Sequence, residues 1–100
     1  MIAVRQTGFS DPLAFEVTVR DPGGETHHRV TMSRADHERL TRGTQPPERC
    51  IAAAFRFLLD REPKEAILSD FDVSVIGRYF PDFEAELPGY LAGPGAPKEP

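Results

Sequence analysis

The sequence has no tryptophan, two methionines and one cysteine among its 100 residues. A single cysteine, Cys50, cannot form an intramolecular disulfide, so no oxidising compartment is implied. No segment approaches the ~20 consecutive apolar residues of a membrane-spanning helix, and residues 1–11 lack the apolar stretch of a signal peptide. We therefore expect a cytoplasmic protein that has no membrane partner.

Motifs typical of enzymes and metal sites are also missing. The spacings CxxC, HxxxH, HExxH and GxSxG do not occur. His27 and His28 are adjacent in an expected strand and point to opposite faces, so they cannot easily bind one zinc ion, and Cys50 falls in an apolar helical stripe. The carboxylates of residues 60–72 have no histidine near them in sequence. We expect no enzymatic activity, no cofactor, and no catalytic or metal-binding residue.

Net charge is −4 and is unevenly distributed. Residues 1–50 contain seven basic and seven acidic side chains, whereas residues 51–100 contain five basic and nine acidic ones. Nucleic-acid binding depends on basic surface that displaces counterions from phosphates. The acidic second half therefore argues against a nucleic-acid partner.

The first third of the chain has the two-residue periodicity of strands. Apolar and polar side chains alternate over residues 15–20 and again over residues 27–32. Residues 21–25 (DPGGE) place proline and glycine where a tight turn requires them, so we predict a hairpin. Because a two-stranded ribbon alone is only marginally stable, residues 2–7 are a candidate third strand.

Helix signals follow the hairpin. Ser33 can accept a hydrogen bond from a first-turn N–H group, and the helix that it begins should end before Gly43. Prolines then precede an amphipathic pattern that predicts a main helix over residues 47–61. Pro63 ends this helix, and shorter helices should follow.

The predicted fold is α+β, in which an antiparallel sheet of two or three strands is covered by the main helix and shorter C-terminal helices. Residues 1–91 form one domain, and residues 92–100, rich in proline and glycine, form a disordered tail. Residues 71–80 are ambiguous between strand and helix. We favour helix because Ile76, Tyr79 and Phe80 fit only that period.

The leading functional hypothesis is a non-enzymatic interaction or regulatory module, with a homodimer as one form of it. Ala53 and Phe57 widen the apolar stripe of the main helix, and aromatic side chains crowd the region after it. The expected interface residues are Phe57, Tyr79, Phe80 and Phe83. Phe55, at the centre of the stripe, should be buried against the hairpin, so Phe57→Ala should be milder than Phe55→Ala.

The alternative hypothesis is a transcription regulator. Residues 64–80 resemble a shortened helix-turn-helix, in which Arg78 would contact DNA. The second helix would be about two residues too short, and the surrounding charge is acidic. These departures make the alternative the weaker of the two.

The blocks FLLDREP (residues 57–63) and RYFP (residues 78–81) resemble those of a group of small uncharacterised bacterial proteins. The likeness extends over residues 15–83 and includes a strand pair and a Pro-Glu pair before the main helix. It implies a bacterial, cytosolic origin. It implies no particular activity, and no functional residue is carried over from it.

Overall fold

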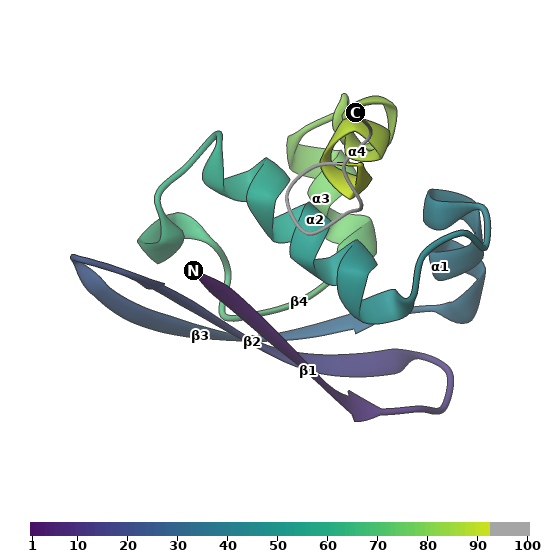
Figure 1. The fold of residues 1–100 in the computed structure, drawn as a ribbon, viewed down its shortest axis with the longest axis horizontal. Coiled ribbons are helices and arrows are strands. Elements are labelled where there is room, and N and C mark those ends of the chain that lie inside the picture. Colours follow the sequence, from purple (N-terminus) through teal and green to yellow (C-terminus); the bar gives the residue numbers. More distant parts are fainter. Residues whose placement is uncertain (93–100) are drawn as a thin grey trace, which may run out of the picture.

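Within residues 1–92, which the computed structural model describes, the strands form one four-stranded mixed sheet (Figure 1). β1 (Ile2–Gly8), β2 (Leu13–Asp21) and β3 (Gly24–Met32) make an antiparallel meander. β4 (Asp70–Asp72) then pairs with β3 in parallel, which gives the order β1-β2-β3-β4. The α+β class is therefore confirmed, whereas the expected two or three strands are corrected to four.

The predicted hairpin is the β2–β3 pair, whose register places Phe15 opposite Val30. In its turn the Asp21 carboxylate accepts a hydrogen bond from the Gly23 N–H at 2.8 Å. Gly24 has φ of 126°, a conformation that glycine adopts without steric cost. Alternate side chains are buried from Leu13 to Val19 in β2 and from His28 to Met32 in β3, as the period of two predicts.

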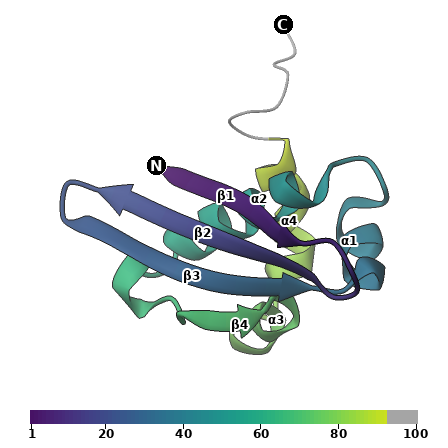
Figure 2. The ribbon, with the colours of Figure 1, turned by 90° about the horizontal axis from the view of Figure 1, so that it is seen from below.

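Helices cover one face of the sheet and leave the other open (Figures 1 and 2). They are chiefly α1 (Arg34–Thr41), α2 (Pro47–Leu59) and α4 (Phe83–Leu91). The predicted main helix is thus confirmed, although it ends two residues before the expected boundary, at Leu59. No helix within residues 1–92 is both long enough and apolar enough to span a bilayer. The predicted disordered tail lies, except for Ala92, outside the described residues.

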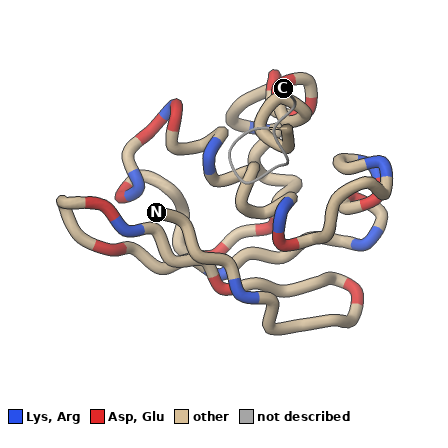
Figure 3. Tube along the Cα trace, viewed as in Figure 1, with Lys and Arg blue, Asp and Glu red and all other residues tan. Residues whose placement is uncertain are grey.

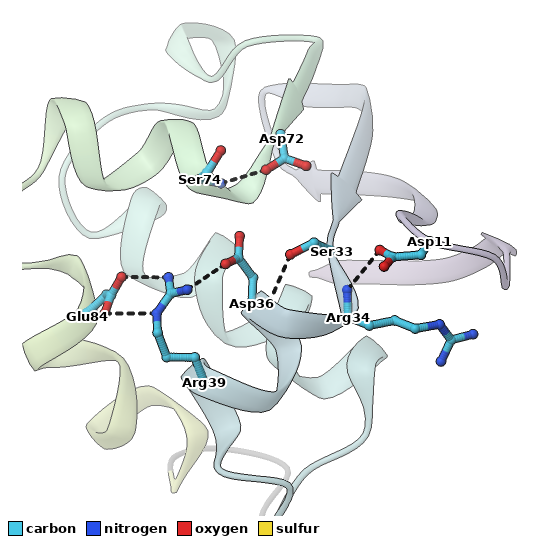
Figure 4. Close-up of polar contacts among 8 residues, drawn as sticks. All are labelled: Asp11, Ser33, Arg34, Asp36, Arg39, Asp72, Ser74 and Glu84. Carbon is cyan, nitrogen blue, oxygen red and sulfur yellow. Dashed lines mark hydrogen bonds and ion pairs between the residues drawn. The ribbon is translucent and has the colours of Figure 1, made fainter.

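Local caps and one arginine fix α1. The Ser33 Oγ accepts a hydrogen bond from the Asp36 N–H at 3.0 Å, as predicted, and Gly43 follows the helix end with φ of 72°. Arg39 donates to Asp36 at 2.6 Å and to Glu84 at 2.8 Å, and thereby joins α1 to α4 (Figure 4). Contacts with Glu84 and Asp36 raise the pKa of Arg39.

After Pro63 the chain differs from the prediction. It forms a single 3-10 turn η1 (Lys64–Ala66), then β4, a second 3-10 turn η2 (Val73–Val75) and the short helix α3 (Ile76–Tyr79). The ambiguous segment is therefore strand at its start and helix at its end. The open edge of β3 explains the strand, because backbone groups there need partners; the Arg29 N–H, for example, donates to the Ser69 carbonyl at 2.8 Å.

Two aromatic clusters flank α2. Toward the sheet, Phe55 contacts the ring of His28 at 5.3 Å and that of Phe71 at 6.0 Å, measured between ring centroids. Away from the sheet, Phe57 contacts three rings from the end of the chain, those of Phe80, Phe83 and Tyr90. Both phenylalanines of α2 are fully buried, so this helix is enclosed on two sides.

Candidate functional site

A groove of about 250 Å³ opens between the end of α2, η1, β4 and α3. Nine of its ten lining residues are apolar or aromatic, and the tenth is an acid. They are Leu58, Glu62, Ala66, Ile67, Leu68, Phe71, Val75, Ile76, Tyr79 and Phe80. Apolar concavities with a few polar groups are the usual form of a binding site.

The groove has a buried wall and an exposed rim. Ile67, Phe71 and Ile76 are buried and belong to the hydrophobic core. Leu68 and Tyr79 remain 49% and 68% exposed, respectively. Large exposed apolar side chains beside an apolar concavity are typical of a surface that binds another molecule.

Lys64 anchors the wall of the groove to the sheet. Its side chain is almost fully buried, and its Nζ lies 2.7 Å from the Asp21 carboxylate and 2.8 Å from that of Glu65. The hydrogen bonds to Asp21 and Glu65 raise the pKa of Lys64, and the same ammonium lowers the pKa of Asp21. Because Asp21 is the last residue of β2, this contact holds η1 against the sheet.

Glu62 is the one acidic residue that lines the groove. It is half-buried, and no hydrogen bond or ion pair engages its carboxylate anywhere in residues 1–92. Its oxygens are accessible to solvent and available as acceptors, because they are not among the buried unpaired polar atoms of residues 1–92. A ligand that brings an N–H donor or a cation to this position would form a charge-assisted hydrogen bond with it.

The structure corrects two of the four expected interface residues. Phe57 is fully buried and Phe83 is 2% exposed, so neither presents surface to a partner. Phe80 is half-buried and lines the groove, and Tyr79 is exposed on its rim. The wide stripe of the main helix thus reflects packing against the sheet on one side and against α4 on the other.

Arg61 closes the cluster around Phe57 from outside. Its guanidinium lies 3.7 Å above the centre of the Phe57 ring, a cation–π contact. It also donates to the Tyr90 hydroxyl at 3.3 Å and to Asp82 at 3.1 Å, and these contacts raise its pKa. The Tyr90 hydroxyl donates in turn to Asp60 at 2.5 Å. These bonds tie the end of α2 to α4.

Residues 64–80 do not form the helix-turn-helix of the alternative hypothesis. Residues 64–80 form two 3-10 turns, a strand and a helix of four residues, which is too short to span a major groove. Arg78 is exposed, but Lys64, the other basic residue of this segment, is buried. The backbone pairing of β4 with β3 is what prevents a first helix here.

The histidines and the cysteine do not form a shared site. His27 lies on the open face of the sheet, His28 is buried against Phe55, and the His37 ring bonds to the Gln45 carbonyl. Burial, helped by the Asp36 carboxylate, raises the pKa of the Cys50 thiol to about 12. Residues 1–92 contain no group of three or more His, Cys, Asp or Glu side chains arranged to hold a metal ion.

The open face of the sheet is polar. Arg5, Glu16, Arg29 and Asp70 stand opposite one another across the four strands, so that charges alternate in sign along the row. Arg5 and Glu16 form an exposed ion pair. Acidic and basic positions are interspersed along the chain, as Figure 3 shows. A mixed, solvated surface of this kind gives little binding energy, so the groove is the stronger candidate.

Sequence reasoning missed Leu68 and Glu62 as site residues. One signal pointed to Leu68: it is a large apolar residue that lies outside the stripe of the main helix, and the polar residues Ser69 and Asp70 follow it directly.

Comparison with protein-family models, curated proteins and solved structures finds no match to this chain. The resemblance of residues 57–63 and 78–81 to small bacterial proteins therefore stays a prediction.

Proposed function

We propose that the chain is a non-enzymatic protein-interaction module. Its groove takes an apolar side chain from a partner protein, and Glu62 accepts a hydrogen bond from a basic residue beside that side chain. The groove itself carries the proposal, because it joins an apolar wall, an exposed aromatic rim and an unpaired carboxylate.

The chemistry of the groove supports this function. Binding energy at protein interfaces concentrates in a few apolar or aromatic anchors that fill a pocket. Tyr79 and Leu68 on the rim supply contact area around such an anchor. A positively charged neighbour would complement Glu62 and the acidic second half of the chain.

Peptide display against the purified protein tests the proposal. Ala66 is exposed and lines the groove, so Ala66→Arg should block it without disturbing the core. Ala85→Arg, an exposed position on α4, is the matched control. We expect selected peptides to combine an aromatic or aliphatic residue with Lys or Arg, and to bind wild type and Ala85→Arg but not Ala66→Arg.

A separate variant tests the expected preference for peptides that contain Lys or Arg. Glu62→Gln should keep the apolar selection and lose the preference for Lys or Arg. Peptides that bind Ala66→Arg as well as wild type, or selections without any apolar consensus, would refute the proposed function. From the FLLDREP and RYFP blocks we further infer that the protein acts in a bacterial cytoplasm, and no second function is proposed.

A further inference from the structure

Phe9 is an exposed aromatic side chain on a loop that is held in place. It lies between β1 and β2 and is 67% exposed. The Arg34 guanidinium donates to the Phe9 carbonyl, and the Arg34 N–H donates to the Asp11 carboxylate at 3.1 Å. These bonds fix the loop to the start of α1. Little conformational entropy would therefore be lost if Phe9 bound to the surface of another molecule.

The groove has the size and lining for a phenyl ring. An apolar cavity of about 150 Å³ lined by Leu, Ile and Phe is large enough to bind benzene. The groove is larger, at about 250 Å³, and its wall is built from the same residue types. It therefore has room for the ring of a phenylalanine and part of the backbone that carries it.

The charged side chain beside Phe9 and the one beside the groove have opposite signs. Arg34 is exposed and pairs with no carboxylate in residues 1–92, and Figure 4 shows its side chain extending away from Asp11 and from α1. Glu62 stands beside the groove with an unpaired carboxylate. Phe9 thus has beside it a guanidinium that no carboxylate of residues 1–92 neutralises, although it donates to the Phe9 carbonyl, and the groove has a carboxylate without a cationic partner.

We propose that the partner in the groove is a second copy of this chain, which inserts Phe9 and pairs Arg34 with Glu62. This inference rests on the proposed function of the groove. Figure 2 shows the β1–β2 loop at the end of the sheet near α1. The groove lies elsewhere on the surface, because it is lined by residues of β4, α3 and the end of α2. The contact is therefore heterologous, and repeated contacts either close into a ring or extend.

A mixing experiment tests the contact. Phe9→Ser removes the inserted ring, Ala66→Arg blocks the groove, and Ala85→Arg is the control. By sedimentation, the average mass of wild type and Ala85→Arg should rise with concentration, whereas each of the other two variants should stay monomeric. An equimolar mixture of Phe9→Ser and Ala66→Arg contains one intact groove and one intact Phe9, so it should form a 1:1 dimer and grow no further.

Neutral variants test the ion pair, and glutamine keeps an N–H donor at position 34 for the Phe9 carbonyl. Arg34→Gln and Glu62→Gln should each weaken self-association roughly two- to fivefold, as expected for loss of an exposed ion pair. The double variant should lose little more than either single variant, because all three lack the same pair. Leu68→Asp on the rim repeats the groove test if thermal melts show that Ala66→Arg disturbs the fold.

Three outcomes would overturn the proposal: a monomeric wild type at every concentration, association that survives in Phe9→Ser, or a mixture of the two variants that stays monomeric. Peptide display distinguishes a failure of the proposed self-association from a failure of the proposed function of the groove. If peptides still bind wild type and not Ala66→Arg, the groove is a binding site and only its occupant was wrong. If they do not, both proposals fall.

Discussion

Replacing Phe57 with alanine should nearly unfold the protein. The side chain is fully buried, and it meets three rings at centroid distances of 5.0, 5.8 and 5.8 Å in edge-to-face geometry. Truncating a buried phenylalanine costs about 3–5 kcal/mol, and each ring pair of this kind contributes about 0.5–1.5 kcal/mol beyond the area it buries. We therefore expect a loss of about 4–5 kcal/mol in the free energy of unfolding, at the upper end of that range.

Such a loss is large for a domain whose total stability is about 5–15 kcal/mol. Thermal melts followed by circular dichroism should show a midpoint lower by roughly 16–40 °C. Phe55→Ala, on the opposite side of α2, should be comparably damaging, whereas Tyr79→Ala on the exposed rim should change stability by less than about 0.5 kcal/mol. The reasoning fails if Phe57→Ala stays within about 1 kcal/mol of wild type while Phe55→Ala unfolds.

Three further predictions concern single polar groups. Burial raises the pKa of Asp72, but hydrogen bonds from Thr31 and Ser74 outweigh it and lower the pKa below its usual value. The ionised carboxylate therefore stabilises the fold above its unfolded pKa of about 3.9, and this contribution is lost as pH falls through the folded pKa. Urea midpoints of wild type and Asp72→Asn should differ at neutral pH and converge in acid, and a gap that persists in strong acid would contradict this. Ser33→Ala should cost about 1 kcal/mol in urea unfolding and Ser33→Gly only a few tenths, so equal costs would argue against the cap. The Cys50 thiol, with its pKa of about 12, should react with a disulfide reagent only as fast as the protein unfolds, and rapid labelling of the native protein would disprove its burial.

The hairpin and the main helix could be predicted because their determinants are local. Alternating side chains and the DPGGE turn specify β2 and β3, and prolines at 46 and 47 mark the start of α2. Ser33 caps α1 by accepting a hydrogen bond from the backbone N–H of Asp36, three residues later. In each case the sequence signal and the interaction that it predicts lie within a few residues of each other.

The groove could not be predicted because its walls come from separate segments. β4 is three residues long and exists through its pairing with β3, which no local pattern encodes. The apolar stripe of α2 also could not show whether its wide side meets α4 or a second protein. Phe57 is therefore a core residue that sequence analysis placed at an interface.

The pairing of β4 with β3 has a consequence for the order of folding. Only Pro22 and Gly23 separate β2 from β3, whereas the bond from Thr31 to Asp72 joins positions 41 residues apart. Closing a longer loop costs more chain entropy, so we expect the hairpin to form early and β4 to join after α2 has docked. The wall of the groove is then among the last segments to close and the first to open in local unfolding. A molecule that fills the groove would slow hydrogen exchange there first, because it binds only the closed form.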